Sequence, residues 1–131
     1  MKCRKTGSKG QSLVETAIII PIILLLVFGV IDFGLIFNNY ILITNASREG
    51  ARKASIGGTD SEVIQVVKNM TSTLELSDMT INVTPSYSTR NYGVQVKVEI
   101  KYKARLITPI INRFFPGGVA NLRAESIMRV E

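Results

Sequence analysis

The sequence predicts an α+β protein: a long N-terminal transmembrane helix continues into a small module of one further helix packed on a three-stranded antiparallel sheet. Two observations predict this fold. Residues 17–37 form an apolar run whose only charged residue is Asp32. At about 1.5 Å per residue this run is roughly 31 Å long, which matches the hydrocarbon core of a bilayer. After about residue 78 the apolar period changes to two, which is typical of half-buried strands.

The first ten residues form a basic leader that predicts the orientation of the chain. They contain four of the 16 basic residues, whereas all 10 acidic residues lie beyond them. The positive charge therefore belongs to a segment beside the membrane and does not indicate nucleic-acid binding. Because basic residues stay on the cytoplasmic side, we expect residues 1–10 in the cytoplasm and the chain beyond about Asn45 outside. The leader lacks periodicity and is expected to be disordered.

The membrane helix is expected to cover residues 11–56. Ser12 and Glu15 fit a capping box, in which the two side chains bind the free N–H groups of the first turn, so we expect the helix to start at Ser12. Pro21 removes one backbone donor and should kink the helix. The glycine pair at 57–58 ends it.

The outer module is expected to cover residues 57–131. A second capping box, formed by Thr59 and Glu62, opens a helix that should run to about Leu76. Three strands with apolar residues on one face follow, at residues 79–84, 94–106 and about 121–130. We expect their sheet to cover the second helix and the outer half of the first, as a small two-layer α+β arrangement.

The composition argues against catalysis and against a metal centre. The chain has no histidine and a single cysteine, Cys3. These counts exclude a disulfide within the chain, a zinc site built on histidine and cysteine, and a histidine-based triad. No nucleophile–base pair or carboxylate pair is recognisable within one module. We therefore expect no enzyme activity, no catalytic residue, no metal and no cofactor.

Glu15 lies at the edge of the apolar run, where burying a carboxylate is costly. In one interpretation it only completes the capping box near the membrane surface, at little cost. In the other, the chain is cut after Gly10, which leaves Gln11 with a free amino group one helical turn from Glu15. In an assembly, Glu15 of one subunit would then neutralise the Gln11 amine of the next.

Asp32 lies deeper in the apolar run, and an acid at such a position is a candidate functional residue. It would meet a basic group on an assembly-platform protein or on a neighbouring subunit. Alternatively, Asp32 lies near the outer leaflet, hydrated or protonated, beside Asn38 and Asn39.

A second apolar group occupies residues 110–115, between turn residues, and is expected to form a short turn or helix. It includes Phe114 and Phe115. These side chains either form an exposed contact for another subunit or close one end of the small core, and we favour the second interpretation.

Gly10, followed by a hydrophobic helix with Glu15 at the fifth position after it, resembles the processing site of type IV prepilins. The rest of the helix is similar to TadE-like proteins, the pseudopilins of the type IV-related tight-adherence (Tad/Flp) pilus system. The stretches that carry the resemblance are residues 15–21, 29–34 and 45–54, with the chain's end at 124–131.

The resemblance implies that a prepilin peptidase cuts between Gly10 and Gln11 on the cytoplasmic side. The subunit would then wait as a single-pass protein of the bacterial inner membrane, with its C-terminus outside. From there it would enter the pilus or its initiating complex through its helix, as a minor pilin that supports adhesion or surface attachment. The implied partners are the peptidase, other pilin and pseudopilin subunits, assembly-platform proteins and the lipid bilayer. Gln11 replaces the phenylalanine of many processed pilins, which bears on N-methylation and not on cleavage.

An alternative function requires no processing. The chain would be a permanently anchored extracytoplasmic binding protein of the cell envelope, and a Gly10→Ala substitution would change nothing. The length of 131 residues exceeds that of the short major pilins of the Tad class, so the resemblance favours a minor subunit.

Overall fold

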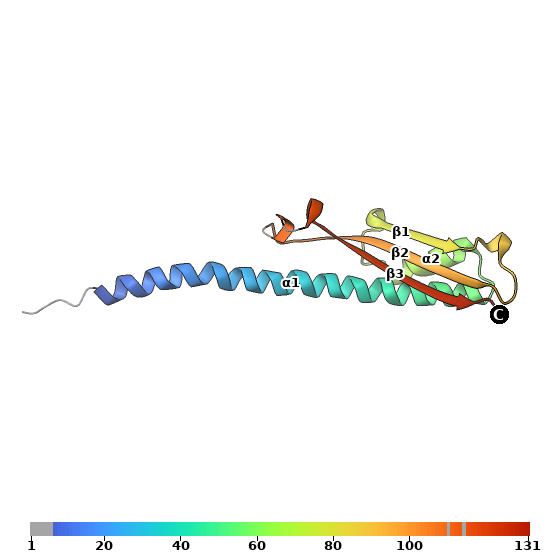
Figure 1. Cartoon of the computed structure of the whole chain (residues 1–131), viewed down its shortest axis with the longest axis horizontal. Coiled ribbons are helices and arrows are strands. Elements are labelled where there is room, and N and C mark those ends of the chain that lie inside the picture. The colour runs from blue at the N-terminus through green and yellow to red at the C-terminus, as the bar shows by residue number, and fades with distance from the viewer. Residues whose placement is uncertain (1–6, 110, 114) are drawn as a thin grey trace, which may run out of the picture.

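The computed structural model describes residues 7–109, 111–113 and 115–131, and it confirms the predicted α+β fold (Figure 1). The helices are α1 (Gly7–Ser55) and α2 (Asp60–Met70), and the strands are β1 (Met79–Thr84), β2 (Gln95–Arg105) and β3 (Val119–Arg129). Single 3₁₀ turns lie between these elements, at Leu76–Asp78, Tyr87–Thr89, Ile111–Arg113 and Pro116–Gly118.

The sheet is an antiparallel meander in the order β1-β2-β3. Ile100 in the middle of β2 pairs with Ile81 of β1 and with Ala124 of β3. Along β2 every second residue from Val96 to Ala104 is buried, whereas the residues between them are exposed or half-buried. The sheet therefore has one face in the core and one face in water, as the period of two predicts.

The core lies between the inner face of the sheet, α2 and the C-terminal half of α1. Small residues on α1 allow this close approach, and the fully buried ones are Ala46, Ser47, Ala51 and Ala54. A Cβ atom added to Gly50 would lie 2.9 Å from Val67 Cγ2 and 3.4 Å from Val98 Cγ1. At this point the α1 backbone is in contact with both α2 and β2.

The N-terminal half of α1 projects away from the module (Figure 1). Among residues 10–31, all are exposed except the half-buried Gly29. The helix is long and apolar enough to cross a membrane, and its most apolar window is only 6% buried. A core helix of a soluble protein would be mostly buried, so the structure favours a membrane-anchored, single-pass protein.

The predicted start of the first helix and the predicted end of the second helix are wrong. α1 begins at Gly7, so Ser12 lies inside the helix, where its carbonyl accepts a hydrogen bond from the hydroxyl of Thr16 at 2.8 Å, and Ser12 forms no capping box. Residues 7–10, expected to be disordered, are helical because adding a turn to an existing helix is easier than starting one. The prediction of disorder for residues 1–6 falls outside the described residues. The predicted kink at Pro21 stays a prediction, since α1 is assigned as one helix through it.

The second helix is shorter than expected, because α2 ends at Met70 and not near Leu76. The backbone N–H and the buried hydroxyl of Thr71 both donate to the carbonyl of Val67, at 3.0 and 2.8 Å. The sequence Thr71–Thr73 has low helix propensity, and its hydroxyls compete for backbone groups. The Thr59–Glu62 capping box at the other end is confirmed, with both reciprocal hydrogen bonds present.

Candidate functional site

The N-terminal part of α1 carries the predicted processing and assembly residues on one exposed side. Gly10, Gln11 and Glu15 lie there together with Val14 and Ile18, around a shallow surface hollow. Gln11 and Glu15 are one helical turn, about 6 Å, apart along the axis. Among the described side chains, none forms a hydrogen bond or an ion pair with Glu15. Asp32 is about 25 Å further along the helix, so it does not belong to this group.

The structure gives no packing reason for a glycine at position 10. A Cβ atom added there would meet no atom within 4 Å. Glycine inside a helix costs roughly 1 kcal/mol relative to alanine. The fold would thus be served as well or better by alanine, and the glycine needs an explanation outside the folded chain.

Asp32 binds a loop of the outer module. Its Oδ1 accepts a hydrogen bond from the backbone N–H of Ile107 at 3.2 Å, and its Oδ2 accepts one from the N–H of Thr108 at 3.1 Å. The residue is only 3% exposed, so its side chain is not hydrated, whereas the place of Asp32 near the outer leaflet and its protonation stay predictions. Pairing with a basic group of another protein stays a prediction. Within this chain, each carboxylate oxygen already accepts one hydrogen bond.

The loop that supplies these two N–H groups connects β2 to β3 and lies against α1. Ile111 reaches the backbone of Gly29, where an added Cβ would lie 3.7 Å from its Cδ1 atom. Phe115 is 41% exposed and Ile107 is 70% exposed. Phe115 therefore does not close the core as we expected, because the loop extends along the helix instead of folding over the sheet. Phe114 falls outside the described residues.

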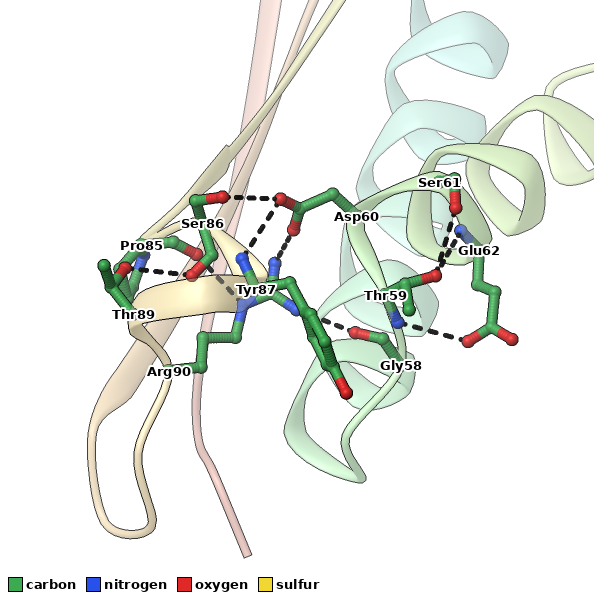
Figure 2. Close-up of polar contacts among 10 residues, drawn as sticks. All are labelled: Gly58, Thr59, Asp60, Ser61, Glu62, Pro85, Ser86, Tyr87, Thr89 and Arg90. Atoms are coloured by element: carbon green, nitrogen blue, oxygen red, sulfur yellow. Dashed lines mark hydrogen bonds and ion pairs between the residues drawn. The ribbon is translucent and has the colours of Figure 1, made fainter.

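A second polar cluster lies at the opposite end of the module, around Arg90 (Figure 2). The guanidinium donates from Nε to the carbonyl of Pro85 at 2.9 Å and from Nη1 to that of Gly58 at 2.8 Å, and Nη2 pairs with Asp60. The side chain of Arg90 is only 3% exposed. It joins the β1–β2 loop to the start of α2.

Asp60 completes this cluster by accepting further hydrogen bonds from the β1–β2 loop. Its Oδ2 takes hydrogen bonds from the Ser86 hydroxyl at 3.0 Å and the Tyr87 N–H at 3.1 Å. Burial raises the pKa of Asp60, but the bonds from Tyr87 and Ser86 and the charge of Arg90 outweigh it and hold the pKa below the ordinary value. Sequence reasoning missed this cluster, because an arginine in a polar loop gives no signal that distinguishes it from a solvated one.

No metal-binding constellation is present in the parts of the chain that the structure describes. Groups of three or more histidine, cysteine, aspartate or glutamate side chains that could hold an ion do not occur there. The polar clusters around Asp32 and Arg90 are internal, with their hydrogen-bonding groups turned to partners in the same chain. Their arrangement holds segments of the fold together.

Residues 10–52 match the family model described as TadE-like protein. The N-terminal segment of this chain is TadE-like. The match begins at Gly10 and ends three residues before α1 does, which confirms the resemblance inferred from the helix. The similarity of residues 124–131 lies outside the matched part. No curated protein and no solved structure matches the chain.

The TadE-like segment suggests a protein associated with the Tad pilus system. Such a protein is membrane-associated and works with other pilus subunits, and the family is in general non-enzymatic. The matched residues coincide with the exposed apolar helix and with its packing surface in the module. The family match thus falls on the membrane helix and its junction with the module, while most of the module lies beyond it.

Proposed function

We propose that this chain is a minor pilin or pseudopilin of a Tad-type pilus. It is made as a precursor, a prepilin peptidase cuts it between Gly10 and Gln11, and α1 then carries it into the pilus or its initiating complex. The observation that supports this most strongly is that the TadE-like match begins at Gly10. The assembled structure supports adhesion or surface attachment.

The exposed surface of α1 supports an assembly role. The helix between Gly10 and Ile31 is apolar and uncovered by its own module, so it needs lipid before assembly and neighbouring helices afterwards. Lipid tails are as apolar as leucine, so moving such a helix from lipid into a bundle gains little from the hydrophobic effect. Close packing and polar pairing then drive assembly, and the Gln11 amine with Glu15 of the next subunit supplies the polar pair.

The proposed membrane arrangement follows from the basic leader. Residues 1–10 lie in the cytoplasm, where the peptidase acts, and the module lies outside. The platform proteins of the pilus then draw the subunit out of the inner membrane. Nucleic acid has no part in this proposal.

A Gly10→Ala substitution tests the processing step. The added methyl group meets no atom, so the fold and the membrane level should be unchanged. We expect the precursor to accumulate and pili to be lost, with the N-terminus read by mass spectrometry of the membrane-extracted protein. Gly34→Ala is the matched control, because Gly34 lies in the same helix and also has nothing within 4 Å of an added Cβ.

Two results would contradict the proposal. One is a wild-type protein that still carries Met1 or Lys2 in cells with an active prepilin peptidase. The other is normal pili with an uncleaved Gly10→Ala protein, which would instead support a permanently anchored envelope protein.

A further inference from the structure

The loop between β2 and β3, described at residues 106–109, 111–113 and 115–118, extends along α1 toward the membrane segment. In Figure 1 it lies beyond the end of the sheet nearest the N-terminus, beside the middle of α1. Two contacts fix its position: the hydrogen bonds from Ile107 and Thr108 to Asp32, and the approach of Ile111 to Gly29. Both contacts fall inside the apolar run that the sequence assigns to the bilayer.

The depth of these contacts limits where the membrane boundary lies. If the boundary lay at Phe37, Asp32 would be about 7.5 Å below it and Gly29 about 12 Å below it. Irregular backbone at that depth is not tolerated where it faces lipid, because each unsatisfied polar group costs several kcal/mol. A boundary near Asp32 places the loop's hydrogen bonds at the interface and leaves the Gly29 contact only about 4.5 Å below it. Residues 13–31 then span about 28 Å, which still crosses the hydrocarbon core.

With the boundary near Asp32, the loop lies at the interface between lipid and water. Its exposed side chains suit that position. Ile107 is 70% exposed and Phe115 is 41% exposed, while Arg113 and Arg105 are exposed cations in and beside the loop. Apolar side chains that enter the boundary region, with cations at headgroup level, are the usual composition of interfacial anchors.

We infer that the described part of this loop, residues 106–109, 111–113 and 115–118, forms an interfacial anchor that inserts Ile107 and Phe115 into the leaflet on the module's side, and that Asp32 fixes this anchor to the membrane helix. The ligand is the phospholipid surface. A lipid is favoured over a second copy of the chain because the loop contacts α1 at Gly29 and Asp32, directly after residues 10–28, which are exposed throughout and form the apolar membrane segment. The inference concerns the chain while it is in the membrane, so it does not depend on cleavage or on pilus assembly.

Depth-dependent quenching tests the anchor. Cys3→Ser gives a background for single labels, and Ile107→Cys, Phe115→Cys and Tyr92→Cys each carry an NBD fluorophore on the full chain in phosphatidylcholine vesicles. Tyr92 is the control, because it is 87% exposed and belongs to the loop between β1 and β2. We expect lipids with a shallow doxyl group to quench NBD at 107 and 115 and to leave NBD at 92 nearly unchanged.

Far-UV circular dichroism first checks that each labelled chain is folded, which exposed positions should allow. Diluting the protein with added lipid then distinguishes the two candidate partners of the loop, a lipid surface and a second copy of the chain. Quenching at 107 that persists on dilution supports a lipid surface. Quenching no greater than at 92 overturns the inference, and so does protection from aqueous iodide that vanishes on dilution, since that result assigns the loop to a second copy.

Discussion

Asp32 accepts a hydrogen bond at 3.1 Å from the backbone N–H of Thr108, a residue 76 positions later in the chain. The neighbouring N–H of Ile107 binds the other carboxylate oxygen at 3.2 Å. A single acid in an otherwise apolar helix thus sets how far along α1 the β2–β3 loop can reach. The position of this loop beside the membrane helix depends on the contact, whereas the core holds the rest of the module on α1.

Asp32→Asn should loosen the loop without unfolding the module. An asparagine offers one acceptor and places an NH₂ group opposite a second N–H, so one of the two hydrogen bonds is lost. Losing this hydrogen bond should lower the free energy of opening the loop from α1 by about 1–3 kcal/mol. Hydrogen–deuterium exchange of the full chain in detergent micelles should show faster exchange at Ile107 and Thr108, by roughly tenfold or more.

Asp78→Asn is the control for this variant. Asp78 accepts from Arg105 at 2.9 Å, but the Arg105 side chain is 73% exposed, so its loss should have little effect on stability. Unchanged exchange at 107 and 108 in Asp32→Asn would show that the carboxylate does not hold the loop.

Arg90→Lys should destabilise the module although it keeps the charge. A lysine cannot serve the carbonyls of Pro85 and Gly58 and the carboxylate of Asp60 from one planar group. Leaving these acceptors unpaired should lower the free energy of unfolding by about 1–3 kcal/mol, measured by urea denaturation of the full chain in micelles. Arg123→Lys, at a site that is 57% exposed, should change it by less than about 0.5 kcal/mol. Equal effects of the two variants would contradict a special role for Arg90.

Acid should weaken the cluster around Arg90. The pKa of Asp60 is lower in the folded chain than its ordinary value of 3.8. Its contribution to stability is therefore fully present above that ordinary value and is lost as the pH falls through the lower, folded value. Asp60→Asn should be less stable than wild type at neutral pH and should lose less stability on acidification, followed by thermal unfolding from about pH 5 to pH 2. Parallel curves for the two proteins would refute this.

Gly50→Ala should destabilise the junction between α1 and the module. The new methyl group would lie 2.9 Å from Val67 Cγ2, and overpacking of a dense core costs about 1–3 kcal/mol, more than the helix propensity gained. Gly34→Ala, with open space around it, should leave the melting temperature unchanged or raise it. A higher melting temperature in both variants would mean that the core adapts without strain.

Glu15→Gln should block assembly and leave the membrane level of the protein unchanged. A neutral amide cannot neutralise the amine of Gln11 in an adjacent subunit. The amount of pili in sheared fractions, measured by immunoblot and electron microscopy, should fall sharply. Glu49→Gln is the control, because Glu49 lies on the same helix beyond the membrane segment and its ion pair with Arg52 is long, at 3.9 Å. Normal piliation in Glu15→Gln would remove the charge-pairing step from the proposal.

The regular elements could be predicted from local patterns. The period of two placed β1 and β2 within a residue or so of their ends and identified the buried face of β2, from Val96 to Ala104. The capping box of Thr59 with Glu62 located the start of α2. Each of these signals depends on residues close together in the chain, so no tertiary information is needed to read it.

The long-range contacts could not be predicted in this way. The partners of Asp32 are backbone N–H groups, and such groups are the same in nearly every residue. The acceptors of Arg90 are the carbonyl of Pro85 in its own loop and, about 30 residues earlier in the chain, the carbonyl of Gly58 and the acid Asp60. Neither contact requires particular residue types at the neighbouring positions, so no sequence pattern predicts it.

The sequence by itself determined that one apolar helix is long enough to cross a bilayer and that a half-buried three-stranded sheet follows it. Only the tertiary structure decided which part of that helix the module covers and how far along the helix the β2–β3 loop reaches. The reason is physical: periodicity and capping are set within a few residues, whereas the partner of a buried carboxylate or guanidinium depends on which backbone the finished fold brings beside it.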